Sequence, residues 1–171
     1  MTPRSIRRRR VPSIRKQPIY DAVVGVPFGR LGVALSGARL ARVDFLDRQT
    51  PIMPPRTPAA RAICRELEAY LANPRHAFRA PLAASGTPFQ RRVWRALKRI
   101  RPGQVRSYGE LAHQLETSAR AIGLACRANP IALVIPCHRV VARGGIGGFM
   151  GRRNGAALDV KRWLLAHERA G

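Results

Sequence analysis

The sequence predicts a mixed fold, in which a small α/β unit with an antiparallel sheet precedes a mostly α-helical unit. Apolar residues alternate between glycine-containing turns over residues 20–46, a pattern typical of short antiparallel strands. Later segments carry apolar residues at helical spacing, each behind a Thr-Pro, Ser or Thr start signal. With 171 residues, the chain can bury a core as one domain or as two small ones.

The α/β unit is expected over residues 17–82. It follows a basic tail over residues 1–16, which is expected to be disordered because its arginines repel one another and little of it can be buried. Behind the strands of residues 20–46, Thr57 is the expected N-cap of a helix with proline at its first position. This helix is expected to stop at Asn73, which precedes another proline.

The helical unit is expected over residues 87–171, beyond a linker at residues 83–86. A second Thr-Pro pair starts its first helix. Two short helices follow, the first capped by Ser107 and the second by either Thr117 or Ser118. A short helix, a tight turn and a second short helix in a basic region suggest a helix-turn-helix.

An apolar run at residues 131–135 predicts a strand that leads into Cys137 and His138. A thiol is a nucleophile only as the thiolate, and a neighbouring imidazole is a common way to obtain one. Adjacent side chains of an extended segment point to opposite faces, so a water or a sharp turn after Pro136 must connect the two groups. The alternative interpretation is an inert buried thiol beside a surface imidazole.

An imidazole that acts as a base also needs an orienting partner, which is usually a carboxylate. The residues alone do not choose among the four carboxylates of the second half. They are Glu110, Glu116, Asp159 and Glu168.

Composition narrows the classes of function and location. The formal net charge is +23, and 29 of the 32 basic residues are arginines, whose planar guanidinium groups suit phosphate, so nucleic acid is the simplest partner. The three cysteines have no paired spacing, which favours a reducing compartment. No apolar run approaches the roughly 20 residues that span a bilayer. We therefore expect no membrane partner and a cytoplasmic, nucleoid-associated location, or a nuclear one in a eukaryote.

The second half closely resembles the O6-alkylguanine-DNA alkyltransferases, also called methylated-DNA–protein-cysteine methyltransferases. The matching run extends from Phe89 to Glu168 and carries five motifs in the family's order and spacing. The resemblance implies a ribonuclease-H-like layout for the N-terminal unit and a winged helix-turn-helix-like C-terminal domain. The motifs are SYGELA at 107–112, ARAIG at 119–123, NP at 129–130, IPCHRVV at 135–141 and KRWLL at 161–165.

The resemblance also implies a reaction. Cys137 would accept the alkyl group of O6-alkylguanine in DNA, and less well that of O4-alkylthymine, in an irreversible, single-turnover transfer. His138 would act as the base through a water molecule, and Glu168 would orient the histidine. Tyr108 would contact the phosphate beside the lesion and the guanine, and Asn129 would form the hinge before the active-site strand.

The DNA partner implied by the resemblance is double-stranded, bound through its minor groove by a monomer, with the damaged nucleotide flipped out of the stack. Arg120 would fill the space of the flipped base. No cofactor is implied, and Cys64 and His76 are too few for a zinc site in the N-terminal unit, so no metal is predicted. The implied DNA-binding residues are Arg120, Tyr108, Ser118, Ala119, Ala121, Gly123 and Arg127.

Two other functions stay open at this point. One is a non-catalytic protein of the same fold that binds alkyl lesions, although such relatives replace the cysteine that this chain keeps as Cys137. The other is a basic helix-turn-helix regulator in which the Cys-His pair is incidental. A regulator needs sequence-specific contacts in the major groove, and the alanine-rich second helix supplies few.

Overall fold

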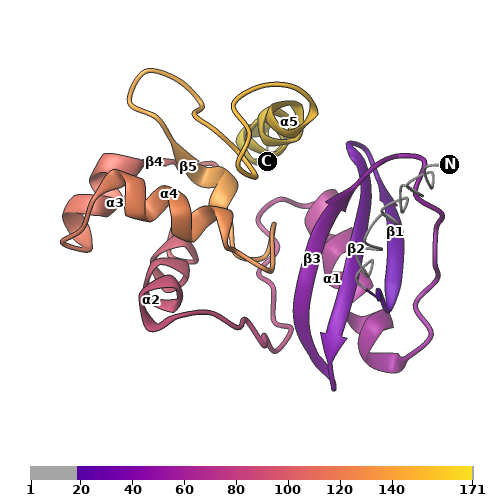
Figure 1. Cartoon of the computed structure of the whole chain (residues 1–171). Helices are drawn as coiled ribbons and strands as arrows, with labels where there is room; N and C mark the ends of the chain where they lie inside the picture. Colours follow the sequence, from indigo (N-terminus) through magenta and orange to yellow (C-terminus); the bar gives the residue numbers. More distant parts are fainter. Residues whose placement is uncertain (1–18, 171) are drawn as a thin grey trace, which may run out of the picture.

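The computed structural model describes residues 19–170, so the predicted disordered tail at residues 1–16 lies outside the described part of the chain. The fold is mixed α/β, with one three-stranded antiparallel sheet, a short parallel strand pair and helices (Figure 1). The elements are β1 (Ala22–Val26), β2 (Gly29–Ser36), β3 (Arg39–Leu46), α1 (Pro58–Ala72), α2 (Pro88–Leu97), β4 (Arg106–Ser107), α3 (Tyr108–Gln114), α4 (Ala119–Arg127), the 3-10 turn η1 (Cys137–Arg139), β5 (Val140–Val141) and α5 (Ala156–Ala170).

The antiparallel strands expected over residues 20–46 are confirmed. They pair in the order β1-β2-β3, and Val33 lies opposite both Ala22 and Val43. These three side chains are buried, and α1 covers one face of the sheet (Figure 1). Alternation with a period of two therefore gives this sheet one face toward the core.

The predicted helix starts are also confirmed, because each cap residue accepts a hydrogen bond from a backbone N–H in the first turn of its helix. The open choice for the cap of α4 falls on Ser118, whose Oγ lies 3.1 Å from the N of Ala121. In α2 and α3 a side chain at the third helical position reaches back to the cap, which completes a capping box. The caps are Thr57, Thr87, Ser107 and Ser118.

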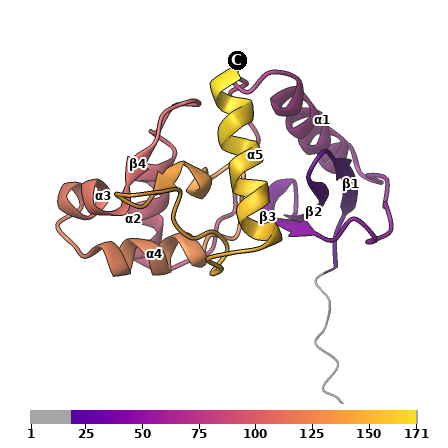
Figure 2. The same cartoon turned by 90° about the horizontal axis from the view of Figure 1, so that it is seen from above.

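The free edge of β3 holds two segments that are distant in sequence. The N–H of Leu40 donates to the carbonyl of Pro81 at 2.8 Å, and the N–H of Val43 donates to the carbonyl of Pro130 at 2.9 Å. The second contact ties the sheet to the chain just before Cys137. Buried apolar residues of both halves form one cluster. Figure 2 shows α5 between the sheet with α1 on one side and α2, α3 and α4 on the other.

The strand predicted over residues 131–135 is wrong. Ile131 makes a single bridge to Val43, and the chain then turns, with the N–H of Ile135 donating to the carbonyl of Ile131 at 2.9 Å. Leu133 adopts a positive φ of 72°, which no strand residue does. All five residues are buried, and a short buried apolar run has the same hydrophobic pattern in a strand and in a packed turn.

Candidate active site

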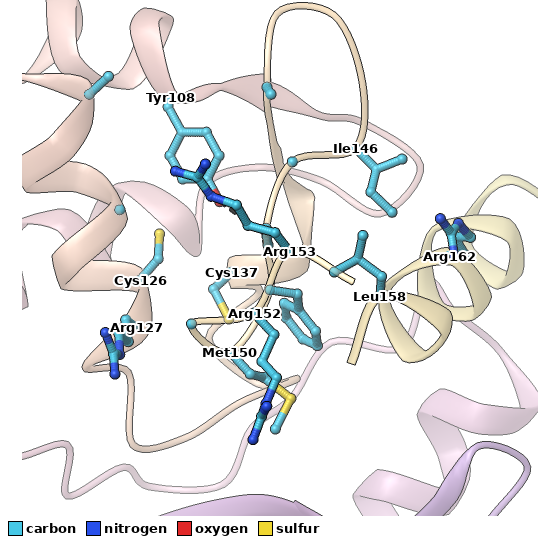
Figure 3. A pocket seen from close by; sticks show the side chains of 17 residues that line it. Tyr108, Cys126, Arg127, Cys137, Ile146, Met150, Arg152, Arg153, Leu158 and Arg162 are labelled. Atoms are coloured by element: carbon cyan, nitrogen blue, oxygen red, sulfur yellow. Dashed lines mark hydrogen bonds between the residues drawn. The ribbon is translucent and has the colours of Figure 1, made fainter. Parts of the chain in front are cut away.

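Cys137 lies at a cavity of about 690 Å³ between α4, the start of α3, the loop of residues 142–153 and the start of α5. The thiol side chain is buried, and its residue is 9% exposed. Figure 3 shows it between Cys126 and Arg127 of α4 and Leu158 of α5. The cysteine is therefore enclosed by protein but accessible from one cavity.

The ionisation of Cys137 is set by opposing effects. Burial raises the pKa of this thiol, and a hydrogen bond from Asn129 and the charge of Lys161 only partly oppose it. The resting group is therefore a neutral thiol and not a preformed thiolate. Any reaction at the sulfur needs a base that removes the proton as the new bond forms.

Cys137 and His138 occupy successive positions of the 3-10 turn η1, and the ring of His138 is fully buried. The backbone of η1 is not extended: the chain turns sharply after Pro136, which is one of the two connections that the sequence left open. Nε2 of His138 lies 2.8 Å from Oε1 of Glu168, whereas Nδ1 is buried and has no hydrogen-bond partner within residues 19–170. Burial lowers the pKa of His138 despite the carboxylate. The ring is thus neutral, with its proton on Nε2 toward Glu168 and a free lone pair on Nδ1.

Glu168 is the centre of the buried polar network. Its Oε1 lies 2.8 Å from the hydroxyl of Tyr70 and 2.8 Å from Nη2 of Arg139, and its Oε2 lies 2.9 Å from Nε of Arg139 and 3.3 Å from the N of Gly103. Burial alone would raise the pKa of Glu168, but the hydrogen bonds from His138 and Arg139 outweigh it and hold the pKa well below its usual range. The carboxylate is therefore ionised.

Sequence reasoning missed three members of this site. Arg139 also donates from Nη1 to the carbonyl of Ile100 at 2.5 Å, which fixes it beside Glu168. Lys161 is fully buried and donates to the carbonyl of Val140 at 2.6 Å, and burial lowers its pKa to about 8. Both lie in motifs singled out by sequence, where a basic residue amid apolar ones was the available signal. Tyr70 carried no such signal. The Glu168 network is Tyr70, His138, Arg139 and Glu168, which are joined by hydrogen bonds to this carboxylate.

Asn129 and Tyr108 have clear structural surroundings. The amide of Asn129 accepts from the N–H of Ile131 at 3.0 Å and donates to the carbonyl of Ile135 at 2.8 Å, so it holds both ends of the turn before Cys137. Tyr108 lines the cavity, and its hydroxyl donates to the carbonyl of Gly148 at 3.3 Å. Burial raises the pKa of Tyr108 to about 12, so its hydroxyl stays a donor.

The residues predicted to bind DNA lie on α4, at its N-cap or along the cavity. Ser118, Ala119 and Arg120 start α4 and are exposed, and Ala119, Gly123 and Arg127 line the cavity. A Cβ on Gly123 would meet nothing within 4 Å, so internal packing does not require glycine there. Other arginines of the same half are exposed: Arg152 and Arg153 line the cavity, and Arg143 lies on the loop of residues 142–153. We call the exposed set the arginine rim, which consists of Arg120, Arg127, Arg143, Arg152 and Arg153.

Two absences concern the described part of the chain only. No three His, Cys, Asp or Glu side chains within residues 19–170 come together as a group that could hold a metal ion. Over the same residues, no helix has the length and apolar character needed to cross a membrane.

The segments that form this site also match known proteins. The family model for the 6-O-methylguanine DNA methyltransferase DNA-binding domain matches residues 88–170. A methylated-DNA–protein-cysteine methyltransferase of Methanosarcina acetivorans is 38% identical over 158 residues, which cover 88% of this chain and 98% of that protein. One of Mycolicibacterium paratuberculosis is 50% identical over 107 residues, 61% of this chain and 62% of that protein.

Solved structures agree with these sequence matches. The crystal structure of Mycobacterium tuberculosis O6-methylguanine methyltransferase superposes with a TM-score of 0.73 at 36% identity, over 86% of this chain and 91% of that one. A structure of the same organism's protein in complex with DNA gives a TM-score of 0.72 with the same identity and coverage. The sequence motifs, the mixed α/β fold and the relatives that match over nearly their whole length agree: the chain belongs to the methylated-DNA–protein-cysteine methyltransferase family.

Proposed function

We propose that this protein repairs DNA by transferring the alkyl group of O6-alkylguanine, and less well that of O4-alkylthymine, to Cys137. The observation that carries the proposal is the thiol at a cavity floor beside a neutral, buried histidine whose other nitrogen is bonded to a carboxylate. The printed names of the relatives describe transfer from methylated DNA to a protein cysteine. No other cysteine within the described residues has both a buried histidine next to it in the chain and access to this cavity.

The proposed reaction is a single displacement. The sulfur of Cys137 forms a bond to the alkyl carbon while the bond from that carbon to O6 of guanine breaks, and its electron pair moves into the base. Nδ1 of His138 takes the thiol proton through a bridging water, and Glu168 stabilises the imidazolium. The proton then returns to the departing guanine. Tyr108 donates a hydrogen bond toward the base as negative charge develops on it.

The product is a thioether, which cellular thiols do not reverse, so each molecule acts once. No redox partner or cofactor enters this balance, because the thiol supplies both the nucleophile and the proton. The protein is thus consumed in the reaction, as a stoichiometric reagent.

DNA is the proposed partner, and the finer features of binding belong to the same proposal. We infer that α3 and α4 act as a winged helix-turn-helix, with α4 in the minor groove of a duplex bound by one monomer. A target atom inside a duplex cannot be reached without flipping its nucleotide, and Arg120 would occupy the space left in the stack. Small residues beside it permit close approach. The ribonuclease-H-like layout of the N-terminal part remains part of this inference.

Transfer of label tests the proposal. The protein is mixed with a duplex that contains O6-[methyl-labelled]guanine, and the labelled peptide is identified by mass spectrometry. We expect one label per molecule, on Cys137. Cys137→Ala should bind the duplex without accepting label. Cys126→Ala is the matched control, since Cys126 lines the same cavity, and it should accept label normally.

The same experiment separates the alternatives. A non-catalytic lesion binder would retain the modified duplex without accepting label, and a sequence-specific regulator would not prefer the modified duplex at all. Label on Cys126 in the wild-type protein would refute the assignment of the nucleophile while leaving alkyl transfer intact.

A further inference from the structure

We propose that Tyr70, which α1 contributes from the N-terminal part of the chain, is a positioning residue for the transfer reaction: its hydroxyl holds Oε1 of Glu168 and keeps His138 in the neutral form that can accept a proton. This inference rests on the proposed function, since it assigns Tyr70 to the same site. It also makes the site depend on both halves of the chain.

The contact is direct and buried. The Tyr70 hydroxyl lies 2.8 Å from Oε1 of Glu168, and the same oxygen lies 2.8 Å from Nε2 of His138. Tyr70 and Glu168 are 98 positions apart in sequence, and Tyr70 is fully buried. The two donors therefore share one carboxylate oxygen in a site without solvent, where each hydrogen bond affects the other.

Packing fixes the phenol ring from several sides. The ring lies edge-on to His167 at 5.5 Å between centroids and against Phe78 at 5.6 Å. The carbonyl of Tyr70 lies 3.0 Å from Nε2 of His167. Figure 2 shows α1, which carries Tyr70, adjoining the C-terminal end of α5, which carries Glu168. This packing fixes the position of the Tyr70 hydroxyl, so that it is oriented toward one acceptor, Glu168.

Tyr70 can only donate to Glu168. Burial and the neighbouring carboxylate raise the pKa of the phenol, so it keeps its proton throughout the range in which the protein is folded. Glu168 is ionised and can only accept. The direction of the hydrogen bond is thus fixed, and the bond draws charge away from the oxygen that faces His138.

The pKa of His138 depends on all the charged groups around His138 and Glu168. Burial lowers the pKa of His138, Glu168 raises it, and Arg139 and Lys161 lower it further. Removing the Tyr70 hydroxyl takes one donor from Oε1, so more of the carboxylate charge falls on His138 and its pKa should rise. The charged and titratable groups around the pair are Tyr70 from α1, Cys137 and Arg139 from η1, and Lys161 and His167 from α5.

The test uses Tyr70→Phe in the full chain, with Tyr20→Phe as the matched control. Tyr20 also donates its hydroxyl to a carboxylate, Asp44 at 2.8 Å, but within the N-terminal sheet. The transfer rate to Cys137 is measured from pH 5 to pH 9. Tyr70→Phe should move the acidic limb of this profile to higher pH and slow transfer on that limb by about threefold or more, because more His138 is protonated at each pH there. Tyr20→Phe should leave the limb in place.

A second readout does not depend on activity. The titration of His138 is followed by NMR in the unreacted protein, with its signal assigned by its loss in His138→Gln. The His138 midpoint should rise in Tyr70→Phe and stay unchanged in Tyr20→Phe. If Tyr70→Phe does not fold, 3,5-difluorotyrosine at position 70 should shift the midpoint the other way, since a more acidic phenol is a stronger donor.

The two proposals can fail separately. If the wild-type protein transfers no label, the proposed function fails, and the NMR titration still decides the role of Tyr70. If label is transferred but both the acidic limb and the His138 midpoint are the same in Tyr70→Phe and Tyr20→Phe, Tyr70 is a packing residue and the inference is overturned.

Discussion

The Glu168 network and the arginine rim hold charged groups of the same half of the chain in opposite ways. In the network each charged group is buried and paired with another protein group, as Arg139 is with Glu168. The guanidinium groups of the rim are exposed, and none of them makes an ion pair within residues 19–170. Arg127, Arg152 and Arg153 of the rim line the cavity together with Cys137 (Figure 3), whose neighbour in sequence, His138, belongs to the network.

The difference separates two tasks. A buried charge is costly unless it is paired, so the network must be complete for the fold to be stable and its geometry is then rigid. Exposed arginines cost the fold little and create a positive field for a polyanion. Changes in the network should therefore appear in stability and chemistry, and changes in the rim should appear in DNA affinity and its dependence on salt.

The largest expected effect is that of Glu168→Gln. It leaves the guanidinium of Arg139 buried without its carboxylate, which should lower the free energy of unfolding by about 3–5 kcal/mol and abolish transfer. Urea denaturation measures the loss. The control is Asp159→Asn on the same helix, whose exposed pair with Arg162 should contribute nothing measurable. Equal stability of the two variants would show that the buried network contributes no more to stability than the exposed pair.

The second largest expected effect is a loss of stability at acidic pH. The pKa of Glu168 lies below its ordinary 4.5, so its contribution is present above about that pH and is lost as the pH falls further. The pKa of His138 lies below its ordinary 6.5, so the unfolded chain gains a proton first, and stability also falls below that pH. Each group adds at most about 1.4 kcal/mol per pH unit. Denaturation from pH 8 to pH 3 measures this slope, and the part of the loss below about pH 4.5 should be absent in Glu168→Gln.

A change in the rim should leave stability alone. Arg120→Ala should slow transfer from a duplex by about 10- to 100-fold, because flipping a base out of the stack costs a few kcal/mol that the arginine would offset. Transfer from the free alkylated base, which needs no flipping, should be unaffected. Arg65→Ala, an exposed arginine on α1, is the control. If the rate of transfer from the free base also fell, Arg120 would act in the chemical step and not in DNA binding.

The smallest effect concerns the turn between α3 and α4. Glu116 adopts a positive φ of 49°, and the N–H of Thr117 donates to the carbonyl of Ala112 in the pattern that usually ends with glycine. Glu116→Gly should therefore raise the free energy of unfolding by about 0.5–1 kcal/mol. Thermal denaturation measures it, and transfer from the free base should not change. A lower melting temperature would show that the backbone is not strained at this residue.

Local signals made most elements predictable. Thr57, Thr87, Ser107 and Ser118 each bond a backbone N–H within their own first helical turn, so the sequence around them contains the whole cause. The apolar run before Cys137 does not form the predicted strand, because a buried strand and a packed turn share the same apolar pattern and only tertiary contacts distinguish them. Its shape depends on the Asn129 amide and on the edge of β3.

The amino-acid sequence alone predicts where the helices begin, the strongly positive charge of the chain, and the place of Cys137 next to His138 in a family motif. Tertiary contacts were needed to show that Nδ1 of the buried His138 has no partner within residues 19–170, that Arg139 and Lys161 are buried, and that Tyr70 bonds Glu168. The physical reason is the separation in sequence between the groups that interact. A cap or a turn is fixed by groups a few residues apart, whereas the partners of Glu168 come from three distant segments and meet only when one core buries them all.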